Sequence, residues 1–333
     1  MREEAYQPSE TRYEKMTYRR CGKSGLKMSA VSLGFWHNFG GNSHFEDCRA
    51  IVRHAFDLGI TVFDLANNYG PPAGAAEEMF GRILQKDLKP HRDEMIITTK
   101  AGYPMWKGPY GDWGSRKYLL ASLDQSLRRM GLDYVDIFYH HRPDPGTPLE
   151  ETMGALADAV KSGKALYAGI SNYGPEEAEK ASRILKGMGV HCLICQSRYN
   201  LLDRGPEKSG LFRTAERCGF GMTAYSPLAQ GVLTGKYSHG IPAGSRADGK
   251  SIFLTRRSIT PEITRKVDRL SEIARRRGQT TAGMALSWIL REKEMASVLI
   301  GASSPAQLDE NIKCLSHPDF TEDELKEIDA VLA

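Results

Sequence analysis

A regular alternation of short apolar runs with longer amphipathic segments constrains this chain more than any other feature of its 333 residues. The apolar runs are rich in β-branched residues and are bounded by turn-forming residues, which is typical of buried strands. They predict strands at residues 31–33, 62–64, 95–100, 134–140, 165–170, 192–196, 221–225 and 297–300. The amphipathic segments predict helices at residues 46–58, 75–84, 116–130, 149–162, 176–186, 210–218, 281–291 and 305–314.

Strands that alternate with helices pair in parallel through right-handed crossovers, and eight such units close into a barrel. We therefore expect an α/β fold of the (β/α)8 TIM-barrel type. An open, doubly wound sheet is the alternative, and it usually carries a G-x-G-x-x-G motif after its first strand. Here the first predicted strand is followed by Gly34-Phe35-Trp36-His37, which does not fit that motif.

Several segments fall outside this repeat. Residues 18–29 contain two short runs on either side of a GKSG turn, which predicts a hairpin that plugs the bottom of the barrel. Residues 260–277 and 321–332 predict extra helices towards the C-terminus. Residues 1–17 are polar, and we expect a loosely held tail or an oligomer contact there. No change of composition divides residues 18–333, so we expect them to form one domain.

Composition excludes several classes of protein. The 45 Lys and Arg against 41 Asp and Glu leave a net charge of +4 without a basic stripe, so we expect no nucleic-acid partner. No window approaches the roughly 18 apolar residues of a membrane helix, and the N-terminal segment lacks the apolar core of a signal peptide.

The six cysteines are scattered along the chain, which favours a cytoplasmic protein with reduced thiols. Cys192 and Cys195 form a C-x-x-C pair inside a predicted strand, but no second pair completes a zinc site. We therefore expect no bound metal, and a redox or metal role for this pair is the less favoured alternative.

The ends of the predicted strands carry many polar, charged and aromatic side chains. In a barrel of this type the active site lies at the C-terminal ends of the strands. At those ends stand Trp36, Asp64, Tyr69, Lys100, His141, Ser171, Asn172, Gln196, Tyr225 and the run 301–303. An inert barrel has no need of charge at this rim, so we expect the catalytic site there.

Asp64, Tyr69, Lys100 and His141 make a plausible set for proton donation. A phenol has a pKa near 10, which is high for an acid at neutral pH. An ammonium group beside it favours phenolate and so lowers that pKa, and a carboxylate keeps the ammonium charged. A histidine at the same mouth can orient a carbonyl oxygen. The set suits reduction of a carbonyl, because its oxygen needs a proton.

Each of these residues also has a structural interpretation. Lys100 and Asp64 can form a simple salt bridge, His141 can be a core histidine, and Tyr69 can be a turn residue. Lys100 can also serve an aldolase as its Schiff-base amine. The convergence of all four at three successive strand ends favours the reductive chemistry.

Several motifs together resemble the aldo-keto reductase family. They are DLANNYG at 64–70, the lysine at position 100, YVDIFYHHRP at 134–143, GISN at 169–172 and LIGAS at 299–303. The resemblance extends from residue 18 to residue 333. It is strongest to the branch that holds the potassium-channel β-subunits and the bacterial L-glyceraldehyde 3-phosphate reductases. His141 and the loop around Trp106 favour the reductases, because the channel subunits tend to carry Asn in the place of His141.

The resemblance implies roles for individual residues. Tyr69 would be the general acid, Lys100 and Asp64 would tune it, and His141 would orient the carbonyl. NADPH would be the cofactor, and its ligands would be Trp36, Asp64, Ser171, Asn172, Gln196, Tyr225, Ser226, Leu228, Gly231, Lys236, Arg246, Gly301, Ser303, Gln307, Glu310 and Asn311. The run 301–304 precedes a predicted helix that starts at Pro305, and a helix N-terminus suits phosphate.

The implied substrates are small aldehydes, of the L-glyceraldehyde 3-phosphate or methylglyoxal type. Trp36, Trp106 and Arg142 are the predicted substrate residues, and Lys107 or Arg116 are alternatives to Arg142 as the cation that meets a substrate phosphate. The resemblance also makes a homo-oligomer, a tetramer or larger, an expected assembly. The alternative function is a redox-sensing channel β-subunit that binds NADPH with little turnover.

Overall fold

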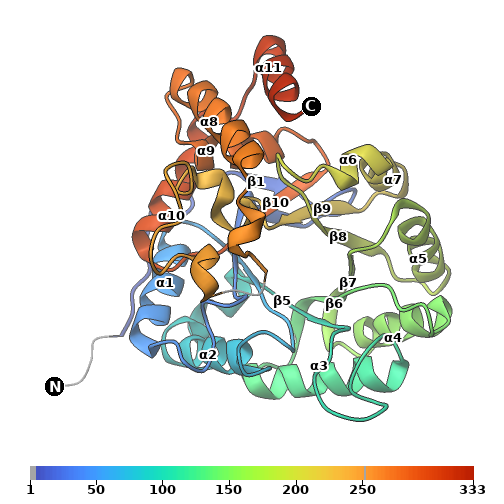
Figure 1. Ribbon diagram of the computed structural model, residues 1–333. Coiled ribbons are helices and arrows are strands. Elements are labelled where there is room, and N and C mark those ends of the chain that lie inside the picture. The colour runs from blue at the N-terminus through green and yellow to red at the C-terminus, as the bar shows by residue number, and fades with distance from the viewer. Residues whose placement is uncertain (1–4, 251–252) are drawn as a thin grey trace.

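The computed structural model describes residues 5–250 and 253–333. Its centre is a closed barrel of eight parallel strands in the order β10-β3-β4-β5-β6-β7-β8-β9 (Figure 1). The predicted barrel and all eight predicted strands are therefore confirmed. The strands are β3 Val31–Gly34, β4 Val62–Asp64, β5 Ile96–Ala101, β6 Val135–His140, β7 Ala165–Ser171, β8 Cys192–Arg198, β9 Gly221–Tyr225 and β10 Met295–Ile300.

Helices form a ring around the barrel (Figure 1). They are α1 Phe45–Asp57, α2 Ala75–Ile83, α3 Arg116–Met130, α4 Leu149–Lys161, α5 Pro175–Gly187, α6 Gly205–Ser209, α7 Leu211–Cys218, α9 Thr281–Leu290 and α10 Pro305–Ile312. The two predicted extra helices are present as α8 Pro261–Arg276 and α11 Glu322–Leu332, and they pack against each other. Short 3-10 or π turns are η1 Leu84–Leu88, η2 Lys89–Glu94, η3 Ala229–Thr234, η4 Arg246–Lys250, η5 Arg256–Ser258 and η6 Lys313–Ser316.

The alternation of strand residues sorts side chains between the inside and the outside of the barrel. On β5, Thr98 and Lys100 point inward, and both bond to the interior carboxylate of Asp64. Thr99 lies between them and points outward, where its hydroxyl donates to Glu77 of helix α2. Adjacent residues of one strand therefore serve two different environments.

The same alternation separates the residues of β6. Tyr139 points inward and is 1% exposed, whereas His140 points outward and bonds to the hydroxyl of Tyr173. Gly169 is the register partner of Tyr139 on β7. A Cβ at this glycine would lie 2.5 Å from the Tyr139 ring, so the absence of a side chain makes room for the ring in the centre of the barrel.

A hairpin closes the N-terminal end of the barrel, as the sequence predicts. Its turn approaches the barrel closely, because Gly22 has a φ of 53° and a Cβ there would lie 2.3 Å from the carbonyl oxygen of Gly219. Cys21 and Met28 of the hairpin are buried against the barrel interior. The hairpin strands are β1 Tyr18–Arg20 and β2 Lys27–Ser29, and the interior residues beneath them are Val62, Ile96, Ile137, Tyr139, Leu193, Ile194 and Ala296.

The N-terminal segment is more firmly held than the sequence predicts. Tyr6 is 7% exposed, and its hydroxyl donates to Asp57 of α1 over 2.7 Å. Arg12 forms an ion pair of 2.5 Å with Glu94. The prediction of a loosely held tail is therefore wrong for residues 5–17, while residues 1–4 lie outside the described residues. Short polar segments carry no periodicity that would reveal such docking.

Within residues 5–250 and 253–333, no helix has both the length and the apolar character that a membrane crossing needs.

Candidate active site

Asp64 ends β4 and is 2% exposed inside the mouth of the barrel. Its Oδ2 accepts from Lys100 Nζ over 2.5 Å. Its Oδ1 accepts from Thr98 Oγ1 over 2.8 Å and from Gln196 Nε2 over 2.9 Å. A buried carboxylate needs such partners, because removal from water without them is costly. Asp64 therefore joins three strands of the barrel at one point.

Lys100 is fully buried near the end of β5. Besides Asp64, its ammonium donates to the carbonyl oxygen of Leu65 over 2.7 Å and lies 3.4 Å from the Tyr69 hydroxyl. Burial lowers the pKa of Lys100, and the negative charge of Asp64 opposes that change. The ion pair with Asp64 therefore partly offsets the effect of burial on the Lys100 pKa.

Tyr69 lies in the loop between β4 and α2, with its ring 9% exposed. Burial, and then the charge of Asp64, raise the pKa of Tyr69 well above its ordinary value. The expected lowering of this pKa by Lys100 is therefore wrong. The ammonium is already bonded to Asp64 and its contact with the phenol is long, so loss of hydration decides the direction. Tyr69 consequently holds its proton at neutral pH.

His141 follows β6 and faces the mouth, whereas its neighbour His140 faces the helices. The rings of His141 and Tyr69 are 5.9 Å apart. Burial and then the charge of Lys100 lower the pKa of His141 well below its ordinary value, so its imidazole is neutral. Its Nδ1 is buried without a hydrogen-bond partner in the described part of the chain. A neutral ring of this kind has a nitrogen available for a ligand.

Glu77 supports this site from outside the barrel, and sequence reasoning did not single it out. It is fully buried at the start of α2, where Thr99 donates to one oxygen and Arg129 of α3 donates to the other over 2.7 Å. The charge of Glu77 also opposes the lowering of the Lys100 pKa. The only sequence signal is its position in the AEE run after Tyr69, because an acidic first turn is common in surface helices.

A second polar network lies across the mouth. Asn172 Nδ2 donates to the carbonyl oxygen of His141 over 3.0 Å and to Ser171 over 3.2 Å. Tyr225 donates its hydroxyl proton to Asn172 Oδ1 over 2.7 Å. The structure thus brings together Ser171, Asn172 and Tyr225, three of the predicted cofactor residues, beside the catalytic candidates.

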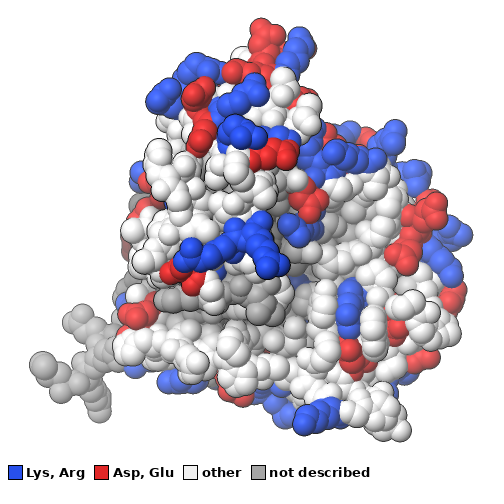
Figure 2. Space-filling model, in the orientation of Figure 1, with Lys and Arg blue, Asp and Glu red and all other residues white. Residues whose placement is uncertain are grey.

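The loop after β9 holds another group of predicted cofactor residues. Gln230 links Ser226 to Arg246, through bonds of 3.3 Å and 2.6 Å respectively. A Cβ at Gly231 would lie 2.9 Å from Lys236 Nζ, so the ammonium lies directly over this glycine. Figure 2 shows basic side chains gathered over the segments that follow β9 in Figure 1.

The same loop folds over the end of β3. The rings of Phe253 and Trp36 are 4.7 Å apart, and the ring of His37 lies 5.3 Å from that of Phe253. Leu228 is half-buried against the main core. Trp36 and Leu228 are thus both partly buried, and Trp36 lies beneath Phe253 of this loop.

The residues predicted for the far end of the cofactor lie around α10. The backbone N–H of Ser303 donates to Gln307 over 2.9 Å. Glu310 is paired with Lys313, and Asn311 is 7% exposed. These residues lie within nine positions of the chain, but Gln307 and Glu310 already have partners within the protein.

The predicted substrate residues have defined partners. Trp106 packs its ring 5.1 Å from that of Tyr118. Arg142 donates to the carbonyl oxygen of Gly102 over 2.7 Å and to Asp112 over 2.9 Å. Trp106 and Arg142 thus fasten the loop after β5 to the barrel.

Two other cations were suggested by the sequence for a substrate phosphate. Arg116 pairs with Asp158 of α4, and Lys107 is exposed on the loop. Arg116 is therefore engaged by a helix of the outer ring.

A nicotinamide dinucleotide fits the groups that the mouth offers. Thr223 Oγ1 and His141 Nδ1 are buried without partners in the described residues. A Cβ at Gly301 would meet only Asn38 Nδ2, at 3.7 Å, so the chain leaves open space there. Lys236 and Arg246 supply positive charge on the covering loop, as phosphate groups require.

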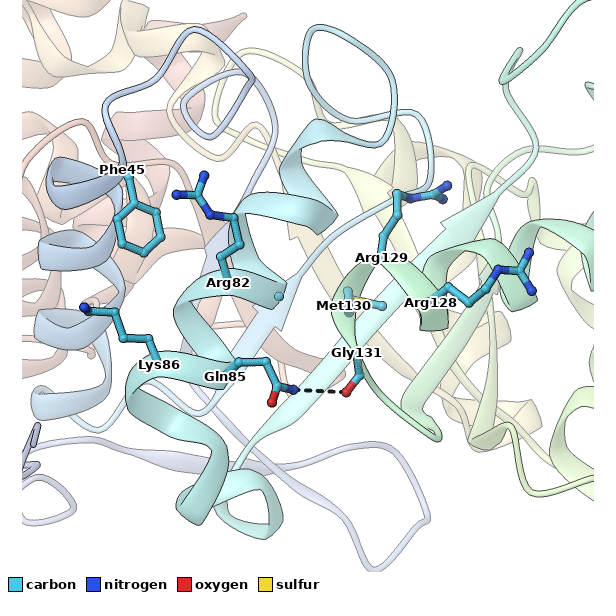
Figure 3. A pocket seen from close by; sticks show the side chains of 9 residues that line it. Phe45, Arg82, Gln85, Lys86, Arg128, Arg129, Met130 and Gly131 are labelled. Atoms are coloured by element: carbon cyan, nitrogen blue, oxygen red, sulfur yellow. Dashed lines mark hydrogen bonds between the residues drawn. The ribbon is translucent and has the colours of Figure 1, made fainter.

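A separate hollow lies on the outer wall between α2 and α3 (Figure 3). It has a volume of about 650 Å³, and Arg82, Lys86, Arg128 and Arg129 line it without a lining carboxylate. Gln85 bridges it by donating to the carbonyl oxygen of Gly131 over 3.1 Å (Figure 3). This hollow is formed by helices and lies apart from the mouth, so it does not belong to the catalytic candidates.

All six cysteines, including Cys192 and Cys195, are free thiols. Among the described residues, no three His, Cys, Asp or Glu side chains converge as a metal site requires.

Known proteins are similar to this chain over nearly its whole length. Residues 30–333 match the model of the aldo/keto reductase family. The chain is 57% identical over 325 residues to the L-glyceraldehyde 3-phosphate reductase of Escherichia coli K12, which covers 97% of this chain and 94% of that protein. The protein of the same name from Escherichia coli O157:H7 is 56% identical over the same shares. A putative voltage-gated potassium channel subunit beta of Schizosaccharomyces pombe is 37% identical over 95% of this chain and 93% of its own.

Proposed function

The chain belongs to the aldo/keto reductase family, and on that premise we propose that it reduces small aldehydes to alcohols with NADPH, with Tyr69 as the proton donor. One observation carries this proposal. The buried contacts from Asp64 to Lys100 and from Lys100 to Tyr69 end at the mouth of the barrel, beside a neutral His141. Such a series can deliver one proton and stabilise the charge that remains.

Tyr69 holds its proton until an oxygen beside it gains negative charge. Its raised pKa keeps the phenol protonated at neutral pH. When the carbonyl carbon is reduced, its oxygen becomes an alkoxide, which is more basic than a phenolate. The proton then passes from Tyr69 Oη to that oxygen, and Lys100 Nζ at 3.4 Å stabilises the phenolate left behind.

His141 acts on the carbonyl before the proton moves. Because the imidazole is neutral, it can donate one N–H to the carbonyl oxygen without competing for the proton of Tyr69. Asn172 donates to the backbone carbonyl oxygen of His141. This bond holds the backbone from which the imidazole extends into the mouth. His141 therefore orients the substrate, and Tyr69 supplies the proton.

The cofactor binds along the same mouth. A bound nicotinamide supplies the hydride that reduces the carbonyl carbon. Ser171, Asn172, Gln196 and Tyr225 would hold the nicotinamide end, because Gln196 bonds to Asp64 and the other three form the polar network across the mouth. The remaining predicted ligands, on the cover of the mouth and around α10, would hold the phosphates and the adenosine end, and they are Trp36, Ser226, Leu228, Gly231, Lys236, Arg246, Gly301, Ser303, Gln307, Glu310 and Asn311.

The preference for NADPH over NADH is part of the proposal. A 2′-phosphate needs a cation or a group of N–H donors, and Arg246 is a half-buried guanidinium on the covering loop. Replacement of Arg246 by Gln should therefore raise the dissociation constant for NADPH by more than that for NADH.

L-Glyceraldehyde 3-phosphate is the first substrate to test, because two relatives that share more than half of their residues with this chain carry that substrate in their names. Small dicarbonyls of the methylglyoxal type are the second. A redox-sensing β-subunit with little turnover is the alternative function, and the named potassium channel subunit favours it at lower identity.

The deciding experiment follows NADPH oxidation with both aldehydes in the wild-type protein and in Tyr69→Phe. The variant should lose about 10²–10⁴-fold in kcat. Its affinity for NADPH, measured by cofactor fluorescence, should stay close to that of the wild type. Tight NADPH binding by the wild type without turnover of any small aldehyde would favour the channel-subunit alternative instead.

A cytoplasmic location and assembly into a homo-oligomer complete the proposal. Both come from the sequence and the resemblance, and light scattering of the purified protein tests the assembly. A mass of one chain in solution would contradict the proposed oligomer.

A further inference from the structure

Arg198 is the last residue of β8, and the mechanism above makes no use of it. The predicted strand ended two residues earlier, at Gln196, so sequence analysis placed Arg198 in a loop. In the structure β8 continues to Arg198, whose register partner on β9 is Tyr225. This extension adds an arginine to the rim of the mouth.

The direction of Arg198 follows from its strand. Residues two apart on a strand point to the same side, with a rise of roughly 6.6 Å. Gln196 points inward, because its Nε2 bonds to Asp64. Arg198 therefore lies on the same face one step closer to solvent, above the catalytic layer. Its neighbour Tyr225 points to the same network, and the positive charge of Arg198 acts on the phenol of Tyr225.

The guanidinium of Arg198 has one carboxylate partner, Asp203, at 3.0 Å from its Nε. Both side chains are well exposed, at 57% and 38% respectively. A carboxylate at Nε occupies the side of the guanidinium, and the two terminal Nη groups form a second edge that can bind an anion. Asp203 thus positions the side chain through Nε and leaves the edge formed by the two Nη groups for a second anion.

Arg142, the cation that the sequence favoured, is in a different situation. It uses Nε for Gly102 and Nη2 for Asp112, and it lies between the rings of Tyr103 and Trp113 at 4.3 Å and 3.7 Å. Two of its three guanidinium nitrogens, and both faces of the group, therefore hold a loop.

We propose that Arg198 binds the anionic group of the substrate, and that it selects aldehydes that carry a phosphate over uncharged aldehydes of the same length. The proposal rests on the function proposed above. Arg198 contributes charge and geometry to binding and takes no part in proton transfer. An arginine fork matches the oxygens of a phosphate, whereas an uncharged hydroxyl leaves it unused.

The test compares glyceraldehyde 3-phosphate with glyceraldehyde, two substrates that differ only by the phosphate. The measured quantity is the ratio of their kcat/KM values. Arg198→Gln should lower that ratio by about 10–100-fold, since hydrogen bonds to charged groups are worth that much. Arg198→Lys keeps the charge and should recover part of the loss, whereas Arg198→Glu should lower the ratio further.

Arg217→Gln is a matched control. Arg217 is also an exposed arginine with one carboxylate partner, Glu179, but it lies on α7. Its replacement should leave the ratio within about twofold of the wild type, as expected for a surface ion pair.

Three results would overturn the proposal. An equal loss with both aldehydes in Arg198→Gln would make Arg198 a general support of the strand end. A raised dissociation constant for NADPH with an unchanged ratio would make it a cofactor residue. Failure of the wild type to reduce either aldehyde would refute the proposed function itself, and with it the role of Arg198 as a selector.

Discussion

The two ends of the barrel use the same strands for opposite purposes. At the closed end, beneath the hairpin, the interior side chains include Val62, Ile96 and Ile194. One or two steps further along the same faces stand Asp64, Thr98 with Lys100, and Gln196 with Arg198. A rise of a few ångströms along each strand therefore separates an apolar plug from a charged mouth.

The difference shows how one scaffold can divide stability from chemistry. The closed end buries apolar surface, which stabilises the fold without any requirement for orientation. The mouth buries charges, which cost free energy unless each has partners of good geometry. The four predictions that follow test this division, beginning with the largest expected effect.

The first prediction removes the cation of the mouth. Lys100→Met leaves Asp64 buried without its cation, so the free energy of unfolding should fall by about 3–5 kcal/mol. The kcat with an aldehyde should fall about 10³-fold. Chemical denaturation and steady-state kinetics measure the two effects. Adding Asp64→Leu should recover much of the stability and none of the activity; recovery of activity would contradict the mechanism.

The second prediction removes apolar volume from the closed end. Met28→Ala should lower the free energy of unfolding by about 2–5 kcal/mol, because Met28 is 1% exposed against the barrel interior. The kcat of the folded protein should stay within twofold of the wild type. Lys27→Ala on the same strand is the control, since Lys27 is exposed. A large fall in kcat for Met28→Ala would show that the two ends are not independent.

The third prediction concerns the dependence of stability on pH through His140, which lies on the outer face of β6 behind the mouth. Burial lowers the pKa of His140 to about 4, below the value of about 6.5 in an unfolded chain. The unfolded state therefore binds more protons, and stability is lost as pH falls from 6.5 towards 4, by up to about 1.4 kcal/mol per pH unit.

Unfolding in urea at several pH values measures this slope. His140→Gln should reduce it, whereas replacement of the exposed His239 by Gln should not. An unchanged slope in His140→Gln would mean that other groups bind these protons.

The fourth and smallest prediction tests the outer support of Lys100. Glu77 raises the pKa of Lys100 against the effect of burial, so Glu77→Gln should lower that pKa further. The alkaline limb of the kcat/KM profile should then move to lower pH. Arg128→Gln, on the same helix as the Glu77 partner Arg129, should leave the limb in place. If the alkaline limb of the kcat/KM profile does not move in Glu77→Gln, Glu77 has a structural role only.

Much of this molecule could be predicted from its sequence, because strand and helix periodicity is a local property. The eight strands, the hairpin and the positions of Asp64, Lys100 and Gln196 on the barrel interior all follow from that periodicity. The separation of His140 from His141 follows from the period of two residues in a strand.

The features that were missed depend on partners far apart in the sequence. The Glu77–Arg129 pair joins residues 52 positions apart, and Arg142 finds Asp112 30 positions away. The extension of β8 to Arg198 depends on pairing with β9, since serine and arginine are not strong strand formers. The pKa of Tyr69 depends on burial, which residue types alone do not reveal.

The pairing of Tyr139 with Gly169 has a consequence for variation within such barrels. Since the ring occupies the volume that a side chain at position 169 would need, the two positions cannot change freely. We expect them to co-vary: a larger residue at 169 requires a smaller one at 139. The Tyr139 ring would then no longer separate the charged mouth from the apolar closed end of the barrel. Directed evolution that exchanges the mouth for another chemistry should therefore retain this pair and vary the rim above it.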